Sequence, residues 1–80
     1  MLLIDASVTI NAGNIIYNPA ENVRYKVLEF KTDAELNAPF LHLEPLPPFG
    51  SASKPFTISL GSIIALGYVL EKENVLHSLL

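Results

Sequence analysis

The stretch that decides the fold is residues 55–70, with the sequence PFTISLGSIIALGYVL. It is the longest part of the chain without a charged residue, so most of it has to be kept from water. In its first half Phe56, Ile58 and Leu60 alternate with polar residues or glycine. This is the period of a strand with one face on a core, and we expect a strand there.

The second half of the stretch allows two interpretations, which lead to different folds. In the first, residues 61–66 form a single helical turn, Gly67 redirects the backbone, and residues 68–72 form the last strand. In the second, Ser62 caps a helix that continues over residues 62–80. We prefer the first, because glycine inside a helix costs about 1 kcal/mol and the stretch is rich in β-branched residues.

The N-terminal part has the clearest strand pattern of the chain. Residues 4–10 alternate apolar and polar side chains without a fault, so we expect a strand with one buried and one exposed face. The sequence NAGN at 11–14 predicts a tight turn, as in a hairpin, into a strand at 15–17. Asn18 and Pro19 then end that strand, because proline cannot donate to a ladder.

The middle of the chain adds two strands. Residues 23–30 carry apolar side chains on one face up to Val27 and on the other face from Leu28 onward, which predicts a bulge or a strongly bent strand. Residues 32–35 match the T-x-x-E capping box, and a short helical turn and a plain polar loop are both open there. Residues 40–44 alternate again and predict another strand.

Together these segments predict a single all-β domain, residues 1–80, of five or six short strands with a short C-terminal helical turn. The expected architecture is a small, strongly bent barrel. It resembles the SH3-like kind in its number of strands and in the helical turn at 61–66. The chain has no Trp, and the resemblance implies no peptide-binding groove. The alternative is an α+β fold, in which a helix over 62–80 packs on a four-stranded sheet.

The composition indicates a surface that another chain covers. Charged residues make up 16% of the chain and apolar residues 50%, whereas ordinary globular domains have about 25% charged residues. We interpret this imbalance as a surface partly buried against a partner. We therefore predict a non-enzymatic structural or assembly subunit that acts through protein–protein contacts in a homo-oligomer or a larger complex. Phage particles and secretion machines contain small subunits of this kind.

Two segments are the candidates for contact with partners. Residues 45–55 hold four of the six prolines, have no helical or strand period, and predict one long loop. Residues 75–80 form an apolar C-terminal tail, at a place where side chains are normally polar. The predicted partner-binding residues are Leu46, Pro47, Pro48, Phe49, Val75, Leu76, Leu79 and Leu80.

The loop also fits a second function, a small regulatory or adaptor module that binds a protein or peptide transiently. Residues 45–48 match the P-x-x-P pattern of polyproline ligands, although no basic residue lies close to it. This alternative explains the loop but leaves the apolar excess unexplained.

No pattern of residues points to catalysis, a cofactor or a metal. The chain contains neither a G-x-S-x-G sequence nor the glycine pattern of a phosphate-binding loop. It has no cysteine, and neither His42 nor His77 has a second ligand at helical spacing. Asp5, Glu29 and Glu44 are acids within expected strands, and we interpret them as solvent-facing. We expect no enzyme activity.

Charge and hydropathy argue against nucleic acid and membranes as partners. The net charge of −3 provides no attraction to nucleic acid phosphates. The 16 uncharged residues at 55–70 fall short of a spanning helix, which needs about 17, and they include hydroxyl side chains. The apolar residues 2–4 are followed at once by Asp5 and have no basic residue before them, unlike a secretory signal. We therefore expect a cytoplasmic or particle-associated protein without a membrane partner.

Overall fold

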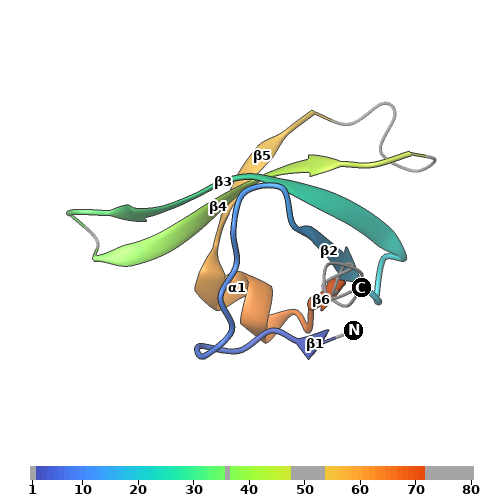
Figure 1. The fold of residues 1–80 in the computed structure, drawn as a ribbon, viewed down its shortest axis with the longest axis horizontal. Helices are drawn as coiled ribbons and strands as arrows, with labels where there is room; N and C mark the ends of the chain where they lie inside the picture. Colours follow the sequence, from blue (N-terminus) through green and yellow to red (C-terminus); the bar gives the residue numbers. More distant parts are fainter. Residues whose placement is uncertain (1, 36, 48–53, 72–80) are drawn as a thin grey trace, which may run out of the picture.

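The computed structural model describes residues 2–35, 37–47 and 54–71. These residues form six antiparallel strands in one sheet and one short helix (Figure 1). In chain order the elements are β1 (Leu2–Leu3), β2 (Ile15–Asn18), β3 (Val23–Asp33), β4 (Ala38–Pro45), β5 (Phe56–Ser59), α1 (Leu60–Ala65) and β6 (Val69–Glu71). The prediction of an all-β fold is confirmed.

The sheet is open and strongly bent (Figure 1). Its strand order is β1-β6-β2-β3-β4-β5, so β6 lies between β1 and β2, while β1 and β5 form the two edges. The strands from β2 to β5 are neighbours in sequence and in space, and β6 returns from α1 to the other side of β2. Because β1 and β5 do not pair within the described residues, closure of the sheet into a barrel is not confirmed.

The end of the described chain follows the first of our two interpretations. The helix α1 has about one and a half turns and ends at Ala65. Gly67 then follows with a φ of 79°, and β6 begins at Val69. A helix over 62–80 is therefore wrong. Ser62 is not the cap either, because the helix starts earlier: the Ser59 hydroxyl accepts the Ser62 N–H at 3.1 Å.

The expected strand at 4–10 is wrong, although its pattern of burial is largely right. Ile4 and Ile10 are buried in the core, but residues 4–10 form no strand, because β1 ends at Leu3 and β2 begins at Ile15. The Asp5 carboxylate accepts the backbone N–H of Ser7 at 2.8 Å and its hydroxyl at 2.6 Å, and the Val8 N–H binds the Asp5 carbonyl at 3.1 Å. These local bonds turn the backbone, because aspartate and serine compete with a ladder for its polar groups.

The tight turn at 11–14 is confirmed, but it does not join two strands of a hairpin. The Asn14 N–H binds the Asn11 carbonyl at 3.1 Å, and Gly13 has a φ of 94°. The turn is fixed to β3, since the Gly13 N–H binds the Val27 carbonyl at 2.7 Å and the Val27 N–H binds the Asn14 carbonyl at 2.8 Å. Residues 4–14 therefore run as a loop from β1 up to β3 and back into β2 (Figure 1).

The long strand β3 contains the predicted bulge. Its pairing with β4 shifts between Val27 and Glu29, so Leu28 is the extra residue. Before the bulge Val27 is opposite Leu43, and after it Phe30 is opposite Leu41. In this strand the apolar residues move from odd to even positions after Val27. The bulge compensates for that shift and keeps apolar side chains on the inner face.

Of the two alternatives at 32–35, the polar turn is correct and the helical turn is wrong. Thr32 and Asp33 are the last residues of β3, and Ala34 and Glu35 lie in a turn. Past this turn, Asn37 adopts a left-handed φ of 52°, which asparagine tolerates better than most residues. The strand predicted at 40–44 is confirmed as part of β4.

The core lies on the inner face of the sheet, between the strands, α1 and residues 4–14. Among the described residues it contains the buried apolar side chains of Ile4, Ile10, Ile16, Tyr25, Val27, Leu41, Leu43, Ile63, Tyr68 and Leu70. Tyr25 is the centre of an aromatic cluster, with its ring 5.6 Å edge-on from Phe56 and 5.8 Å from Tyr68. This cluster joins β3, β5 and the residue before β6.

Candidate binding surfaces

The structure describes two of the eight predicted partner-binding residues. Leu46 is half-buried, and its N–H binds the Arg24 carbonyl at 2.9 Å, which extends the pairing of β4 with β3 by one residue. Pro47 follows and is exposed. The other predicted contacts, Pro48, Phe49, Val75, Leu76, Leu79 and Leu80, lie outside the described residues, and so does His77.

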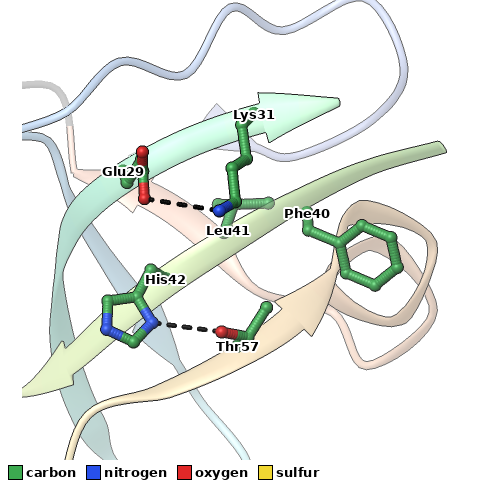
Figure 2. Close-up of a pocket in the computed structure, with 6 residues that line it drawn as sticks. All are labelled: Glu29, Lys31, Phe40, Leu41, His42 and Thr57. Carbon is green, nitrogen blue, oxygen red and sulfur yellow. Dashed lines mark hydrogen bonds and ion pairs between the residues drawn. The ribbon is translucent and has the colours of Figure 1, made fainter. Parts of the chain in front are cut away.

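A groove runs along the outer face of β3, β4 and β5. On β4, Leu41 and Leu43 are buried, so Phe40 and His42, which alternate with them, face outward. Across the sheet His42 is opposite Glu29 and Thr57, and Phe40 is opposite Lys31. Figure 2 shows the side chains of these neighbours gathered on one side of the three strands.

The groove has two adjoining hollows of about 280 and 510 Å³. They share Lys31, Phe40 and Thr57. The larger hollow continues along Thr32, Ala34 and Glu35 toward the β3–β4 turn. We call the two hollows together the outer groove.

The polar contacts drawn inside the outer groove in Figure 2 are exposed. Lys31 Nζ lies 3.9 Å from Glu29 Oε1, and both side chains are more than half exposed, so water screens most of this attraction. His42 Nδ1 lies 3.1 Å from Thr57 Oγ1. The half-buried Phe40 adds apolar surface to these polar groups, so the groove offers both apolar contact and hydrogen-bonding groups.

His42 stands out in the sequence as one of two histidines, but the outer groove was not predicted. One signal was present: Phe40 is an apolar aromatic residue on the polar side of an alternating strand. Which residues of β3 and β5 lie beside it depends on the strand register, and the sequence alone does not determine that register.

A second surface consists of exposed leucines around β1. Leu2, Leu3 and Leu66 expose 43%, 62% and 55% of their surface, and we call them the leucine surface. Leu66 lies in the turn before Tyr68, whose carbonyl accepts the Ile4 N–H at 3.2 Å. The turn after α1 and strand β1 therefore lie at the same end of the molecule (Figure 1).

Among the described residues, Tyr25 and Asp5 have a shifted pKa, and each shift has a structural explanation. Burial raises the pKa of Tyr25, and so does the bond from its hydroxyl to Glu21 Oε1 at 3.0 Å. Hydrogen bonds from the Ser7 hydroxyl and N–H lower the pKa of the exposed Asp5 carboxyl. Neither group lines the outer groove. Within the described residues, no group of three or more histidine and acidic side chains could hold a metal ion.

Comparisons of the chain with family models, with curated proteins and with solved structures found no match. Across residues 2–35, 37–47 and 54–71, no helix has the length and apolar character that crossing a bilayer requires.

Proposed function

We propose that this chain is a structural subunit that works through protein–protein contacts, in a homo-oligomer or a larger complex. The observation that carries the proposal is the leucine surface. Leu2 and Leu3 are exposed on the edge strand β1, and Leu66 is exposed in the turn after α1 at the same end of the molecule. Exposed large apolar side chains of this kind are typical of interaction sites. The low charged fraction of 16% supports the same conclusion.

The predicted contacts of the loop and the tail belong to this proposal. Leu46, Pro47, Pro48 and Phe49 would extend the contact on the loop side, and Val75, Leu76, Leu79 and Leu80 on the tail side. A chain that ends at Asn74 tests the tail. We expect it to keep its circular dichroism spectrum and to sediment as a smaller species than the full chain; an unchanged assembly would remove the tail from the proposal.

The leucine surface is tested by sedimentation velocity over a wide range of concentrations. We expect the full chain to assemble, and Leu66→Lys to weaken assembly without unfolding the chain, because Leu66 is already exposed. Leu28→Lys is the matched control, since Leu28 is an exposed leucine at the β3 bulge. A full chain that stays monomeric throughout, or a Leu66→Lys variant that assembles like Leu28→Lys, would contradict the proposal.

We also propose that the open sheet is a member of the SH3-like barrels. Three features support this: the long bent strand β3 with its bulge, the helical turn α1 between β5 and β6, and the return of β6 to β2. An experimental structure tests it. A sheet whose β4–β5 part packs across the core from β1, β6 and β2, as in a partly open barrel, would support the proposal, and a flat sheet would contradict it.

A second candidate function is the adaptor module, and the outer groove favours it. The groove lies on the outer face next to the edge strand β5, where an extended peptide could pair with the strand and place a side chain beside Phe40. Selection from a random peptide library, followed by amide shift mapping, tests this function. Binding that shifts Thr57 and is lost in Phe40→Ala would favour the adaptor over the structural subunit.

A further inference from the structure

The two edges of the sheet differ in how they are protected. Exposed strand edges invite pairing with other chains, and natural proteins guard them with lysine, proline or charge. The edge strand β5 directly follows Lys54 and Pro55, both exposed. The edge strand β1 is Leu2–Leu3, with neither charge nor proline. Of the two edges, β1 is the one without lysine, proline or charge, and it is short.

The backbone of β1 offers a donor and an acceptor on its free side. In an antiparallel ladder, alternate residues direct their N–H and C=O groups to the same neighbouring strand. The Ile4 N–H binds the Tyr68 carbonyl, and Leu2 and Leu3 are opposite Leu70 and Val69. Leu2 and Ile4 therefore direct these groups to β6, and Leu3 directs its own away from β6. No described strand pairs with Leu3 on that side.

The side chains beside Leu3 extend the apolar character of this edge. Leu3, Val69 and Tyr17 form one row across β1, β6 and β2 on the outer face. Val69 and Tyr17 are half-exposed, and the exposed Leu3 ends the row at the edge of the sheet. A strand that pairs with β1 would cover Leu3 and come close to the rest of the row.

We propose that the strand which pairs with β1 is β1 of a second copy, antiparallel to the first, with Leu3 opposite Leu3. A twofold contact needs a surface that is complementary to itself. Leu3 meets this need, because it presents one donor and one acceptor on an uncharged edge. The pairing would join two six-stranded sheets into one continuous sheet across the dimer. This inference rests on the proposed structural role and names the partner of the leucine surface.

The size of the contact predicts a reversible dimer. Stable interfaces bury about 1,600 Å² in total, and two paired strands of two residues cover only part of that. Leu2 and Leu66 of both copies have to contribute the rest. We therefore expect a dimer that forms and dissociates with protein concentration.

Cysteine cross-linking tests the register directly, because the chain has no cysteine of its own. Paired residues of this kind have Cα atoms about 5.5 Å apart, within the about 4.4–6.8 Å that a disulfide spans. Leu3→Cys should therefore form a covalent dimer under mild oxidation. The control is Thr57→Cys, also exposed but on the guarded edge. Because a pre-formed dimer raises the effective concentration, Leu3→Cys should cross-link at least about tenfold faster.

The outcomes separate this inference from the proposed function. If the wild-type chain assembles but Leu3→Cys cross-links no faster than Thr57→Cys, pairing through β1 is overturned and the structural role keeps its support. A wild-type chain that is monomeric at every concentration overturns both. Leu3→Lys gives a second test without oxidation: with an unchanged circular dichroism spectrum it should sediment as a monomer where Leu28→Lys is a dimer. A dimeric Leu3→Lys chain would overturn the inference.

Discussion

Arg24 and Glu71 form a two-point ion pair that reaches across β2 and joins β3 to β6. Arg24 Nε lies 2.8 Å from Glu71 Oε2, and Arg24 Nη2 lies 2.8 Å from Glu71 Oε1. Arginine and carboxylate in this planar, paired geometry form the strongest type of surface ion pair. Since the two residues are far apart in sequence, the pair fixes the position of the last described strand on the outer face.

Glu71→Gln should lower the free energy of unfolding by about 0.5–1 kcal/mol, a small effect because the Arg24 side chain is 52% exposed. The loss should shrink at high salt, which screens exposed pairs. Urea unfolding at low and high salt measures both effects. Glu29→Gln is the control, because its 3.9 Å pair with Lys31 is longer and more exposed. Equal values for the two variants would show that the Arg24 pair adds no stability.

The two glycines at either end of the α1 region should respond in opposite directions to alanine. Gly67 has a φ of 79°, which is strained for any residue with a Cβ, so Gly67→Ala should destabilise the fold by about 1 kcal/mol. Gly61 is exposed and helical, and its added Cβ would meet only the Ser59 hydroxyl at 3.9 Å. Gly61→Ala should therefore stabilise the fold by up to about 1 kcal/mol. Thermal unfolding of both variants measures these changes. Melting temperatures that shift in the same direction in both variants would contradict the assigned backbone conformations.

Ser59 holds the start of α1, and its removal should be measurable. Ser59→Ala deletes the hydroxyl that accepts the Ser62 N–H, and loss of such a cap costs about 1 kcal/mol. Ser62→Ala removes only the hydroxyl that the Ser59 hydroxyl donates to at 3.0 Å, so its effect should be smaller. Chemical unfolding gives both values. If Ser62→Ala proved the more damaging, the cap would have been assigned to the wrong serine.

Tyr25 should make the fold sensitive to alkaline pH. Because its pKa is raised in the folded chain, the contribution of its neutral form is complete below the ordinary tyrosine pKa of about 10. It is lost as the pH rises from there toward the folded pKa. In Tyr25→Phe the unfolding midpoint should therefore fall less steeply than in the wild type as the pH rises above about 10. Tyr17→Phe, whose lost hydroxyl binds Asn22 near the surface, should keep the wild-type decline. Unfolding midpoints measured between neutral and alkaline pH test this, and identical curves for the two variants would contradict it.

The sequence predicts those features that local residues determine. The parity change at Val27 and Leu28 located the bulge, and the glycine at position 67 separated helix from strand. The alternation at 4–10 predicted which isoleucines are buried but not the backbone, because the side chain of Asp5 bonds locally and replaces a ladder. In the same way, two serines three residues apart could both cap α1, and only the actual helix start distinguishes them.

The candidate surfaces were harder to predict, because they depend on which strands become neighbours. Nothing in the sequence near Leu3 indicates that β6 would pair with it, or that its other side would be free. The outer groove likewise requires Lys31, Phe40 and Thr57 to be brought together from three strands. Long-range register of this kind is set by the packing of the whole core.

The position of β6 between β1 and β2 has a consequence for synthesis on the ribosome. The strands β2 to β5 follow one another in the chain and in the sheet, so they can pair in the order in which they are translated. The nascent chain cannot place β1 until residues 69–71 have left the exit tunnel, because β6 is its only described neighbour. Until then, one edge of β2 and the apolar residues 2–4 have no partner strand. Such late, non-local closure slows folding, and this is the interval in which two nascent chains on one message could meet through the same edges.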